Sequence, residues 1–466
     1  MSNMTKYSMY TNNTCIVPPD PNLVKKLKEE YKKEKKKNKK LTEVEFFVKK
    51  GYFKNKIFGL DNNVIKDPDE PINRDIALMP LPKFKPRGDV NVLFLLVDFS
   101  DQPHTQTVAH FKKLLFSEGN SNYSEKSLKE YYKEVSYGEV NVIGYVSDWI
   151  RMPRPYAYYV NGEDGTGPYP TNTQKLVEEA VEIAKQSGKI EWDIFDLNGD
   201  GKIEALSVLH AGRGAEQTGA GQGDIWSHKS QTTKKIHVTN KTYALTYLTV
   251  PEDSRLGVIA HELGHLLFEW PDLYDAGPRN STITQGLGDW CLMAGGSWNN
   301  DGNTPAYPSA WCRYGQGWST TINITSDQEL IVNDIETNKE VYRLWTKGQD
   351  SAEYFILENR QKAKFDKYLP GNGILIYHID EKAINNWNED HLGVGLMQAD
   401  GRRDLQSLFN GNQGDDGDPF PGSSKNLTFG TNTKPNSRSY SNKNTAVYVK
   451  LLDERSSKAI KVKMRV

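Results

Sequence analysis

The sequence has few of the features that mark disulfide-rich or membrane-spanning proteins. Its 466 residues include three cysteines, Cys15, Cys291 and Cys312, too few for a disulfide framework, and they leave the redox compartment open. The longest apolar run, VLFLLV at 92–97, is far shorter than the about 20 residues of a membrane-spanning helix. The first residues, MSNMTKYSMYTNNTC, lack the basic and apolar regions of a secretory signal, so the sequence leaves the localisation unknown.

An excess of charge of one sign is also missing. Lys and Arg total 59 and Asp and Glu total 60, which gives a net charge of −1. A nearly neutral chain gives no electrostatic reason to expect nucleic acid or an anionic membrane as a partner. Hydrophobic residues make up 37% of the chain and aromatic residues 11%, which is typical of a globular protein, and the length suggests roughly two or three domains.

Residues 1–87 are predicted to form a charged, pro-like N-terminal segment and a linker. A helix is expected at 23–50, and its Lys-rich stretch KKLKEEYKKEKKKNKK favours a solvated helix or a mobile arm over a patch for acidic partners. The stretch GLDNNVIKDPDEPINRD at 59–75 is rich in Asp, Asn and Pro, and it is predicted to be the linker.

The rest of the chain predicts an α+β fold. Strands are expected at 92–99, 140–150 and 204–212, and helices at 127–138 and 172–188. After about residue 320 the apolar period becomes two, as in AIKVKMRV at 459–466, which is typical of strands. The sequence therefore predicts a domain of mixed helices and strands at 88–320 and a β-rich C-terminal domain at 321–466.

The stretch VIAHELGHLLFEWPDLYD, at 258–275, contains the strongest signal for chemistry. Residues four apart lie on one face of a helix, so His261 and His265 can both point at one Zn²⁺ ion. Glu262 lies about 100° round the helix from His261, where a general base for metal-assisted hydrolysis belongs. The apolar flanks favour this site over an ordinary buried helix, because unpaired buried charge is costly.

Two histidines need a third protein ligand. Glu269 would lie about 6 Å beyond the second histidine on a continuing helix, which is too far along the axis to share the ion. Pro271 is expected to end the helix, and Asp272 lies just beyond it, where the chain turns. Asp272 is therefore the preferred third ligand, with a plain helix-end turn residue as the alternative, and Asp275 and Asp289 are the fallbacks.

A second metal is predicted in the loop DLNGDGKIE at 196–204. Its alternating oxygen side chains suit Ca²⁺. The candidate ligands are Asp196, Asn198, Asp200 and Glu204. The loop is not a complete EF-hand, because Ser207 stands where the bidentate Glu would be, and Glu204 substitutes only in part. Structural calcium is favoured over a plain Asx-Gly turn, and GDDGDP at 414–419 is a weaker calcium candidate.

The string HELGHLLFEWPDLYD resembles the zinc motif of the immune inhibitor A family of secreted metallopeptidases. Further blocks resemble that family in the same order over about 88–440: VDFSDQP, SLKEYYKEVSYG, DLNGDGKIEALSVLHAG, IWSHKS, GLGDWCLMAGGSW, EYFILENRQ, LPGNGILIYHID, QADGRRDLQ and GDDGDPFPG. The resemblance implies a zinc endopeptidase that acts on proteins or peptides.

That family is similar to the metzincins, in which a third ligand follows a helix-ending glycine and a methionine turn lies under the site. The resemblance assigns CLMAGG to this turn, with Met293 as an apolar floor that does not ligate. Phe268 stands where the shorter metzincin pattern has glycine, and this departure leaves the identity of the third ligand open. His228 and His378 are expected to be structural residues.

The preferred interpretation is a zinc-dependent endopeptidase with Glu262 as general base. A proteolytically silent zinc- and calcium-binding protein, and a calcium-dependent binding module on the C-terminal β region, are the alternatives. Finally, TCIVPPDPN places Cys15 before two prolines and resembles the inhibitory cysteine segment of matrix metalloproteases, in which a thiolate fills the open zinc position. An ordinary cysteine is the alternative there.

Overall fold

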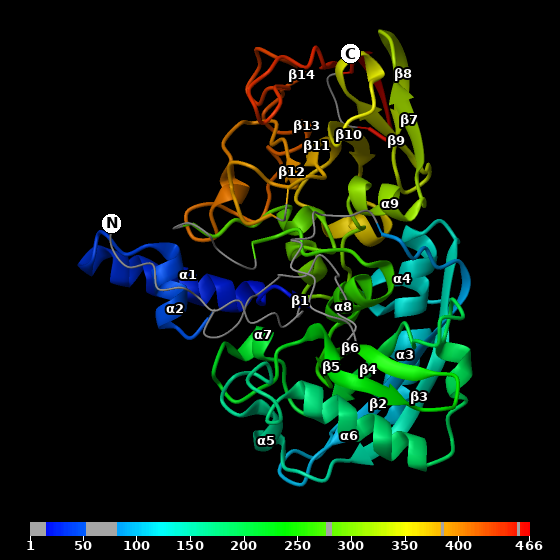
Figure 1. Cartoon of the computed structure of the whole chain (residues 1–466). Coiled ribbons are helices and arrows are strands. Elements are labelled where there is room, and N and C mark those ends of the chain that lie inside the picture. Colours follow the sequence, from blue (N-terminus) through cyan, green and yellow to red (C-terminus); the bar gives the residue numbers. More distant parts are fainter. Residues whose placement is uncertain (1–14, 53–81, 276–281, 384–385, 454–456) are drawn as a thin grey trace.

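The chain forms two lobes with a helical N-terminal segment beside their junction (Figure 1). The computed structural model describes residues 15–52, 82–275, 282–383, 386–453 and 457–466. The predicted linker at 59–75 lies outside these residues. Helices and sheets mix as the sequence predicted, since the lower lobe in Figure 1 combines both and the upper lobe is mostly strands.

The lower lobe is built on a six-stranded sheet with the order β1-β5-β6-β4-β2-β3. Neighbouring strands among β2, β3, β4 and β6 are parallel, β5 is antiparallel to β6, and β1 is antiparallel to β5. The N-terminal strand β1 therefore forms one edge of the sheet. The strands are β1 Cys15–Ile16, β2 Gly88–Asp98, β3 Val140–Arg151, β4 Leu206–His210, β5 His228–His237 and β6 Tyr243–Pro251.

Both faces of this sheet are covered by helices, as expected for parallel strands that are apolar on both sides. In β2, Phe94 and Leu96 belong to one core, and Leu93 and Leu95 belong to the other. Helices α4 and α8 contribute to the first core, and α6 to the second. The helices of this lobe are α3 Val108–Phe116, α4 Leu128–Val135, α5 Tyr156–Val160, α6 Thr173–Gln186, α7 Ala215–Thr218, α8 Leu256–Phe268 and α9 Ala310–Gln316.

Capping residues explain where two of the predicted helices begin. Ser127 and Glu130 form a reciprocal capping box at the start of α4, because each side chain accepts from the other residue's backbone N–H at 3.1–3.2 Å. Asn172 caps α6 by accepting from the N–H of Lys175 at 3.2 Å. Both helices lie within the predicted ranges.

The upper lobe consists of two sheets that pack on a shared core. It confirms the strands that the alternation of apolar residues after residue 320 predicted. One sheet has the order β12-β11-β10-β9-β7, with β13 paired to β11, and the other has the order β14-β15-β16-β8. The strands are β7 Thr320–Ile324, β8 Gln328–Asn333, β9 Glu340–Leu344, β10 Glu353–Arg360, β11 Gly373–Asp380, β12 Val394–Leu396, β13 Phe420–Pro421, β14 Thr428–Phe429, β15 Tyr448–Leu451 and β16 Ala459–Arg465.

Short 3-10 helices occur in both lobes. They are η1 Tyr123–Glu125, η2 Trp192–Phe195, η3 Gly288–Trp290, η4 Gly295–Trp298, η5 Thr346–Gly348, η6 Lys364–Tyr368 and η7 Asp404–Gln406.

A buried ion network fastens the two lobes together. Arg313 of α9 pairs with Glu358 of β10, and Glu358 also accepts from Arg360 at 3.1 Å. Arg360 in turn binds Asp366 at 2.5–2.7 Å and donates to the backbone carbonyl of Trp290 at 3.1 Å. Because these charges are paired and hydrogen-bonded, their burial is tolerated, and β10 is held against the loop that contains the predicted methionine turn.

The N-terminal segment contains helices α1 Pro21–Lys37 and α2 Glu43–Lys49. The prediction of a solvated helix or a mobile arm is wrong for one face of α1, which buries Leu23, Val24, Leu27 and Tyr31. Tyr31 stacks on Phe409 of the upper lobe with ring centroids 4.8 Å apart. The lysines hid this apolar stripe, because they occupy the opposite face and lower the mean hydropathy of the helix.

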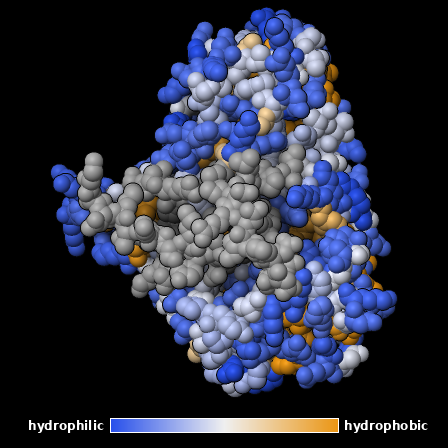
Figure 2. Space-filling model, in the orientation of Figure 1, coloured by the Kyte–Doolittle hydropathy of each residue, from blue (hydrophilic) through white to orange (hydrophobic). Residues whose placement is uncertain are grey.

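The exterior of the two lobes is largely hydrophilic on the face shown in Figure 2, outside the grey atoms. Among the described residues, no helix has the length and apolar character needed to cross a membrane.

Candidate metal centre and active site

The helix with the two histidines, α8, runs through the core of the lower lobe, and all its residues are buried. Close packing around such a helix requires small residues at points of contact. A Cβ atom on Gly264 would lie 2.8 Å from Sδ of Met293 and 3.1 Å from the ring of Trp270. The glycine of HELGH therefore lets the predicted methionine turn pack directly against the helix beside His265.

The end of α8 directs the chain back towards the histidines. The helix ends at Phe268, before the predicted stop at Pro271, because Glu269 adopts the left-handed conformation with φ of 54°. The N–H of Trp270 then donates to the carbonyl of Gly264 at 3.2 Å, which closes a turn typical of helix ends. The carboxylate of Glu269 points elsewhere and accepts from the N–H of Lys83 at 2.8 Å.

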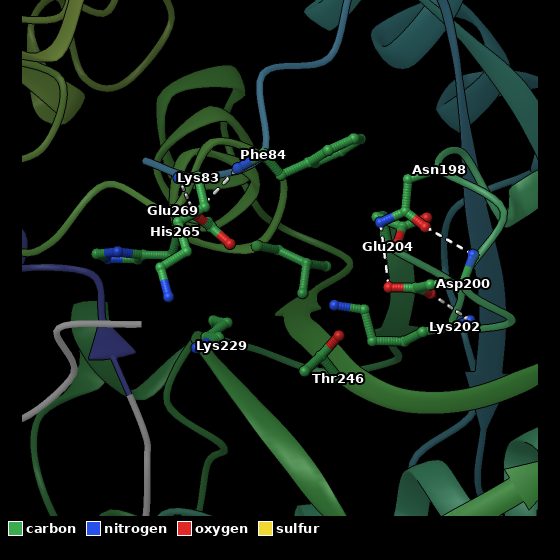
Figure 3. A pocket seen from close by; sticks show the side chains of 11 residues that line it. Lys83, Phe84, Asn198, Asp200, Lys202, Glu204, Lys229, Thr246, His265 and Glu269 are labelled. Atoms are coloured by element: carbon green, nitrogen blue, oxygen red, sulfur yellow. Dashed lines mark hydrogen bonds between the residues drawn. The ribbon is translucent and has the colours of Figure 1, made fainter. Parts of the chain in front are cut away.

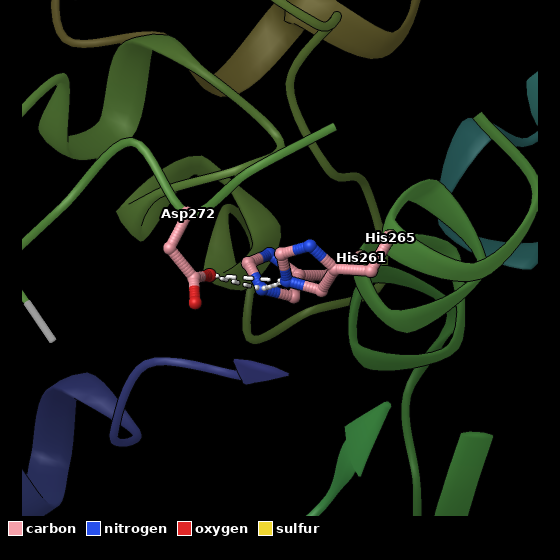
Figure 4. A group of neighbouring side chains, drawn as sticks. All are labelled: His261, His265 and Asp272. Carbon is pink, nitrogen blue, oxygen red and sulfur yellow. Dashed lines mark hydrogen bonds and ion pairs between the residues drawn. The ribbon is translucent and has the colours of Figure 1, made fainter. Parts of the chain in front are cut away.

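Three side chains meet beyond this turn: His261, His265 and Asp272 (Figure 4). The Nε2 atoms of the two histidines are 3.0 Å apart. Each Nε2 lies 3.1 Å from Oδ1 of Asp272. The structure thus brings together the two histidines and the preferred third ligand of the sequence analysis, around one point.

Backbone carbonyls orient both imidazole rings. Nδ1 of His261 donates to the carbonyl oxygen of Leu292 at 2.8 Å, and Nδ1 of His265 donates to that of Trp270 at 2.6 Å. A carbonyl can only accept, so Nδ1 holds the proton and the lone pair of each neutral ring is on Nε2. Sequence reasoning missed both partners, because a backbone carbonyl has no residue-type signature.

The three donor atoms fit a zinc ion. Ligands in a tetrahedral site with bonds of about 2.0–2.1 Å lie roughly 3.3 Å apart, close to the separations found here. The second oxygen of Asp272 is buried and has no hydrogen-bond partner among the described residues. Burial lowers the pKa of His261. For Asp272, burial opposes ionisation, but His265 and His261 outweigh it and lower the pKa. These shifts favour the neutral imidazole and the carboxylate that a metal requires.

Glu262 lies next to this group on α8 and is fully buried. Burial raises its pKa well above the usual value, and the charges of Asp272 and Glu216 add to the effect. The backbone N–H groups of Val17 and Lys229 act in the opposite direction and stabilise the charged form. Neither carboxyl oxygen makes a hydrogen bond of normal geometry within the described part of the chain, so the group is available for a water molecule or a substrate.

The fallback ligands lie outside the three-residue group. Asp275 accepts from the N–H of Thr284 at 3.3 Å. Burial, with the nearby charge of Asp418, raises the pKa of Asp289 to about 7. The two lone histidines have partners of their own. His228 bonds to Thr173 at 2.9 Å and His378 to Glu353 at 3.0 Å, as expected for structural residues.

The predicted calcium loop brings three carboxyl groups together. The oxygens of Asp196, Asp200 and Glu204 lie within 4.8 Å of one another, and the amide of Asn198 donates to Asp200 at 3.1 Å. Burial, with the neighbouring charges of Asp200 and Asp196, raises the pKa of Glu204 to about 7, and its Oε1 has no partner among the described residues. Ser207, which stands at the position of the bidentate EF-hand glutamate, lies buried in strand β4.

The weaker calcium candidate at 414–419 contributes one residue to an acidic group. Asp415 lies near Asp400 and Asp404, whereas Asp418 accepts from the indole N–H of Trp290 at 2.9 Å. The sequence therefore located the loop but not the residues that gather there.

A cavity of about 330 Å³ lies between His265 and the acidic loop (Figure 3). It is bordered by His265 at one end and by the acidic loop at the other. Its remaining charged walls are Lys83, Lys202, Lys229 and Glu269. Since both signs of charge face the cavity, it offers partners for a polar side chain of a ligand.

The N-terminal segment pairs with the edge of the sheet beside this centre. Cys15 pairs with Lys229 and Ile16 with His228 across the β1–β5 register. The chain continues along the sheet edge, where the N–H of Val17 donates to the carbonyl of Ser227 at 3.3 Å. The side chain of Cys15 lies outside the described part of the structure, so its predicted contact with the metal stays a prediction.

Comparison with known proteins places the catalytic region in one family. The family model for the catalytic domain of immune inhibitor A peptidase M6 matches residues 87–320. Immune inhibitor A from Bacillus thuringiensis subsp. alesti is 31% identical over 289 residues, which are 50% of this chain and 41% of that protein. The pre-pro-metalloprotease PrtV from Vibrio cholerae serotype O1 is 28% identical over 330 residues, 60% of this chain and 35% of that protein.

The chain thus matches less than half the length of these curated relatives. The family model, however, spans half of the chain and contains the helix with the two histidines, the turn to Asp272 and the acidic loop. The chain therefore belongs to the immune inhibitor A (M6) peptidase family.

Proposed function

We propose that the chain is a zinc-dependent endopeptidase that hydrolyses peptide bonds in proteins or peptides. The observation that supports this most strongly is the triangle of donor atoms from His261, His265 and Asp272, 3.0–3.1 Å apart, with Glu262 beside it. In this proposal, residues 88–320 form a metzincin-like catalytic domain, with Met293 as its apolar floor, and 321–466 form a β-rich domain.

Zinc held by the two histidines and Asp272 would acidify a water molecule and polarise the substrate carbonyl. Glu262 accepts the proton of the attacking water and passes it to the amide nitrogen of the leaving product, as a general base and then a general acid. The carbonyls of Leu292 and Trp270 keep the imidazole rings in one orientation throughout. The buried walls around Glu262 exclude bulk water, which strengthens each of these interactions.

The number of possible metal ligands at this site favours an enzyme over a proteolytically silent zinc protein. A structural zinc site closes its fourth position with a protein ligand. The group of possible ligands at this site contains three members among the described residues, and the residue next to it is the carboxyl of Glu262. A site of this kind keeps one position for water or substrate.

We also propose that residues 1–87 form an inhibitory pro-segment, of which the described part is 15–52 and 82–87. The support is the position of β1 on the edge strand β5, beside Glu262, where an extended substrate would bind. The name of the Vibrio relative, a pre-pro-metalloprotease, is consistent with such a segment. The thiol of Cys15 as a zinc ligand is a separate part of this proposal.

A structural calcium ion in the loop at 196–204 is the second metal of the proposal. The support is the unpartnered, buried Oε1 of Glu204 next to Asp196 and Asp200. Oxygen donors of this kind suit Ca²⁺, and a bound ion would keep Glu204 ionised in spite of its burial.

The test of the proposed function is hydrolysis of casein or a fluorogenic peptide before and after treatment with a chelator. Activity that disappears with the chelator and returns with one equivalent of zinc, but not with calcium alone, supports the proposal. Hydrolysis that continues in protein shown to be free of metal would contradict it.

A further inference from the structure

The Ile16–Val17 peptide group of the N-terminal segment lies beside the candidate active site, between Tyr274 and strand β5. β1 runs antiparallel to β5, and Val17 continues the pairing through its bond to Ser227. This is how an extended peptide adds to the edge of a sheet. The segment therefore shows one path by which an extended chain, such as a substrate, can lie along this edge.

The Ile16–Val17 peptide group is contacted at both of its ends. The hydroxyl of Tyr274 donates a hydrogen bond to the carbonyl oxygen of Ile16. The N–H of Val17 donates to the carbonyl oxygen of Ser227 at 3.3 Å. These are the two atoms of a peptide bond whose charge and protonation change in hydrolysis, because the oxygen becomes negative and the nitrogen gains a proton.

We infer that Tyr274 is a catalytic residue whose hydroxyl donates to the carbonyl oxygen of the scissile bond, an inference that rests on the proposed function of the same site. Tyr274 is buried, and its ring centroid lies 6.4 Å from that of His261. The backbone on both sides is fixed, because Leu273 donates to Met293 at 2.8 Å and Asp275 donates to Thr284 at 3.1 Å. The hydroxyl is therefore held in place before the substrate arrives.

The hydrogen bond strengthens as the reaction proceeds. When the water oxygen bonds to the carbonyl carbon, Glu262 takes the water proton and the carbonyl oxygen becomes negative, so the donor at Tyr274 is worth most at that moment. When the carbon–nitrogen bond breaks, the oxygen returns to a neutral carbonyl and Glu262 gives its proton to the nitrogen. Tyr274 keeps its own proton throughout and acts only as a donor.

Two tryptophans contact the neighbouring carbonyls and serve as controls. The indole N–H of Trp226 donates to the carbonyl of Val17 at 2.9 Å, and that of Trp298 donates to the carbonyl of Pro18 at 2.8 Å. These carbonyls do not change charge during hydrolysis of the preceding bond. Loss of such a contact weakens substrate and transition state alike, which raises KM and leaves kcat nearly unchanged.

The experiment compares Tyr274→Phe with Trp298→Phe in the full-length, zinc-loaded protein. Each substitution is also made together with Val17→Pro, which removes an N–H that holds the chain's own segment, so that competition by this segment does not decide the result. The measurements are zinc per chain, kcat and KM on a peptide, and the affinity for a phosphinic peptide, which mimics the tetrahedral transition state.

Tyr274→Phe is expected to retain zinc, to lose about 10²-fold in kcat with KM within about threefold, and to bind the phosphinic peptide more weakly by a similar factor. Trp298→Phe is expected to change mainly KM. Parental kcat and phosphinic-peptide affinity in Tyr274→Phe, with Glu262→Gln inactive, would overturn the inference and leave the proposed function standing. Loss of zinc from Tyr274→Phe would overturn it in favour of a structural role. If the parent were no more active than Glu262→Gln, both would fall.

Discussion

The two candidate metal sites of the lower lobe differ in how far the protein itself holds the donor atoms in place. At the histidine site the donors are 3.0–3.1 Å apart and buried, and backbone carbonyls orient both rings. In the acidic loop the oxygens of Asp196, Asp200 and Glu204 also gather within 4.8 Å of one another, but some of them are engaged in the loop's own hydrogen bonds. There the carboxylate of Asp196 is already occupied by the N–H groups of Gly199 and Gly201, at 2.8 and 2.9 Å.

In the proposed function, this difference separates a reactive site from a supporting one. A catalytic metal needs its ligands in position before substrate binds, because reorganisation during the reaction would raise the barrier. The loop is closed by its own hydrogen bonds as an Asx turn, so an ion there adds stability without creating the conformation. Loss of a ligand should therefore abolish function at the histidine site, whereas at the acidic loop it should only lower the stability of the protein.

The largest effect is expected from Asp272→Ala. The substitution leaves two histidines for the metal, so zinc affinity should fall by more than the about 10–100-fold typical of losing an outer-shell partner, and hydrolysis should disappear. Zinc per chain after dialysis against graded chelator measures this. Asp275→Ala is the matched control, and a greater loss of zinc from that control would move the third ligand to Asp275.

The next largest effect concerns the N-terminal segment beside the candidate active site. Val17→Pro removes the N–H that binds Ser227, so the segment should release and the peptidase rate should rise by about tenfold, equivalent to about 1.4 kcal/mol of lost docking. Cys15→Ser, assayed at the same zinc content, separates the thiol from the strand. Equal rates for the parent and both variants would rule out an inhibitory segment.

A smaller effect is expected at the acidic loop. Calcium at 100 times its Kd should add about 2.7 kcal/mol to the free energy of unfolding, which corresponds to a rise of several degrees in Tm. Asp200→Ala should remove most of that rise. Asp148→Ala, at an exposed surface ion pair with Lys189, should keep it. A melting curve that does not respond to calcium would leave the plain Asx-Gly turn as the interpretation of this loop.

The smallest effect on the metal is expected from Glu269→Gln. Its carboxylate holds the N–H of Lys83 rather than the ion, so zinc content should not change, and the free energy of unfolding should fall by roughly 1–2 kcal/mol at most. Zinc analysis checks the metal content, and thermal melting checks the change in stability. A clear loss of zinc would show that the exclusion of Glu269 by its distance along the helix axis was wrong.

Local sequence patterns were enough to predict the elements whose causes are local. The spacing of His261 and His265 predicted one helix face, and alternation predicted the strands after residue 320. The stop before Asp272 was predicted with the wrong cause, since the left-handed turn at Glu269 precedes Pro271. A non-glycine residue in that conformation gives little sequence signal.

Contacts between distant parts of the chain could not be predicted in the same way. Tyr274 meets Ile16 across 258 residues, and no periodicity relates the two. The docking of α1 on Phe409 and the orientation of His261 by Leu292 also depend on the final packing. The sequence therefore predicted the residues that gather at the candidate site, whereas the groups that orient them and lie beside them required the structure.

The central claim is that Glu262 is the base at a zinc site made by His261, His265 and Asp272. The most direct measurement is the hydrolysis rate of Glu262→Gln beside the parent at equal zinc content. The ligands are untouched, so zinc should be retained while turnover falls by about 10²–10⁴-fold or more. Unchanged turnover with zinc still bound would contradict the account.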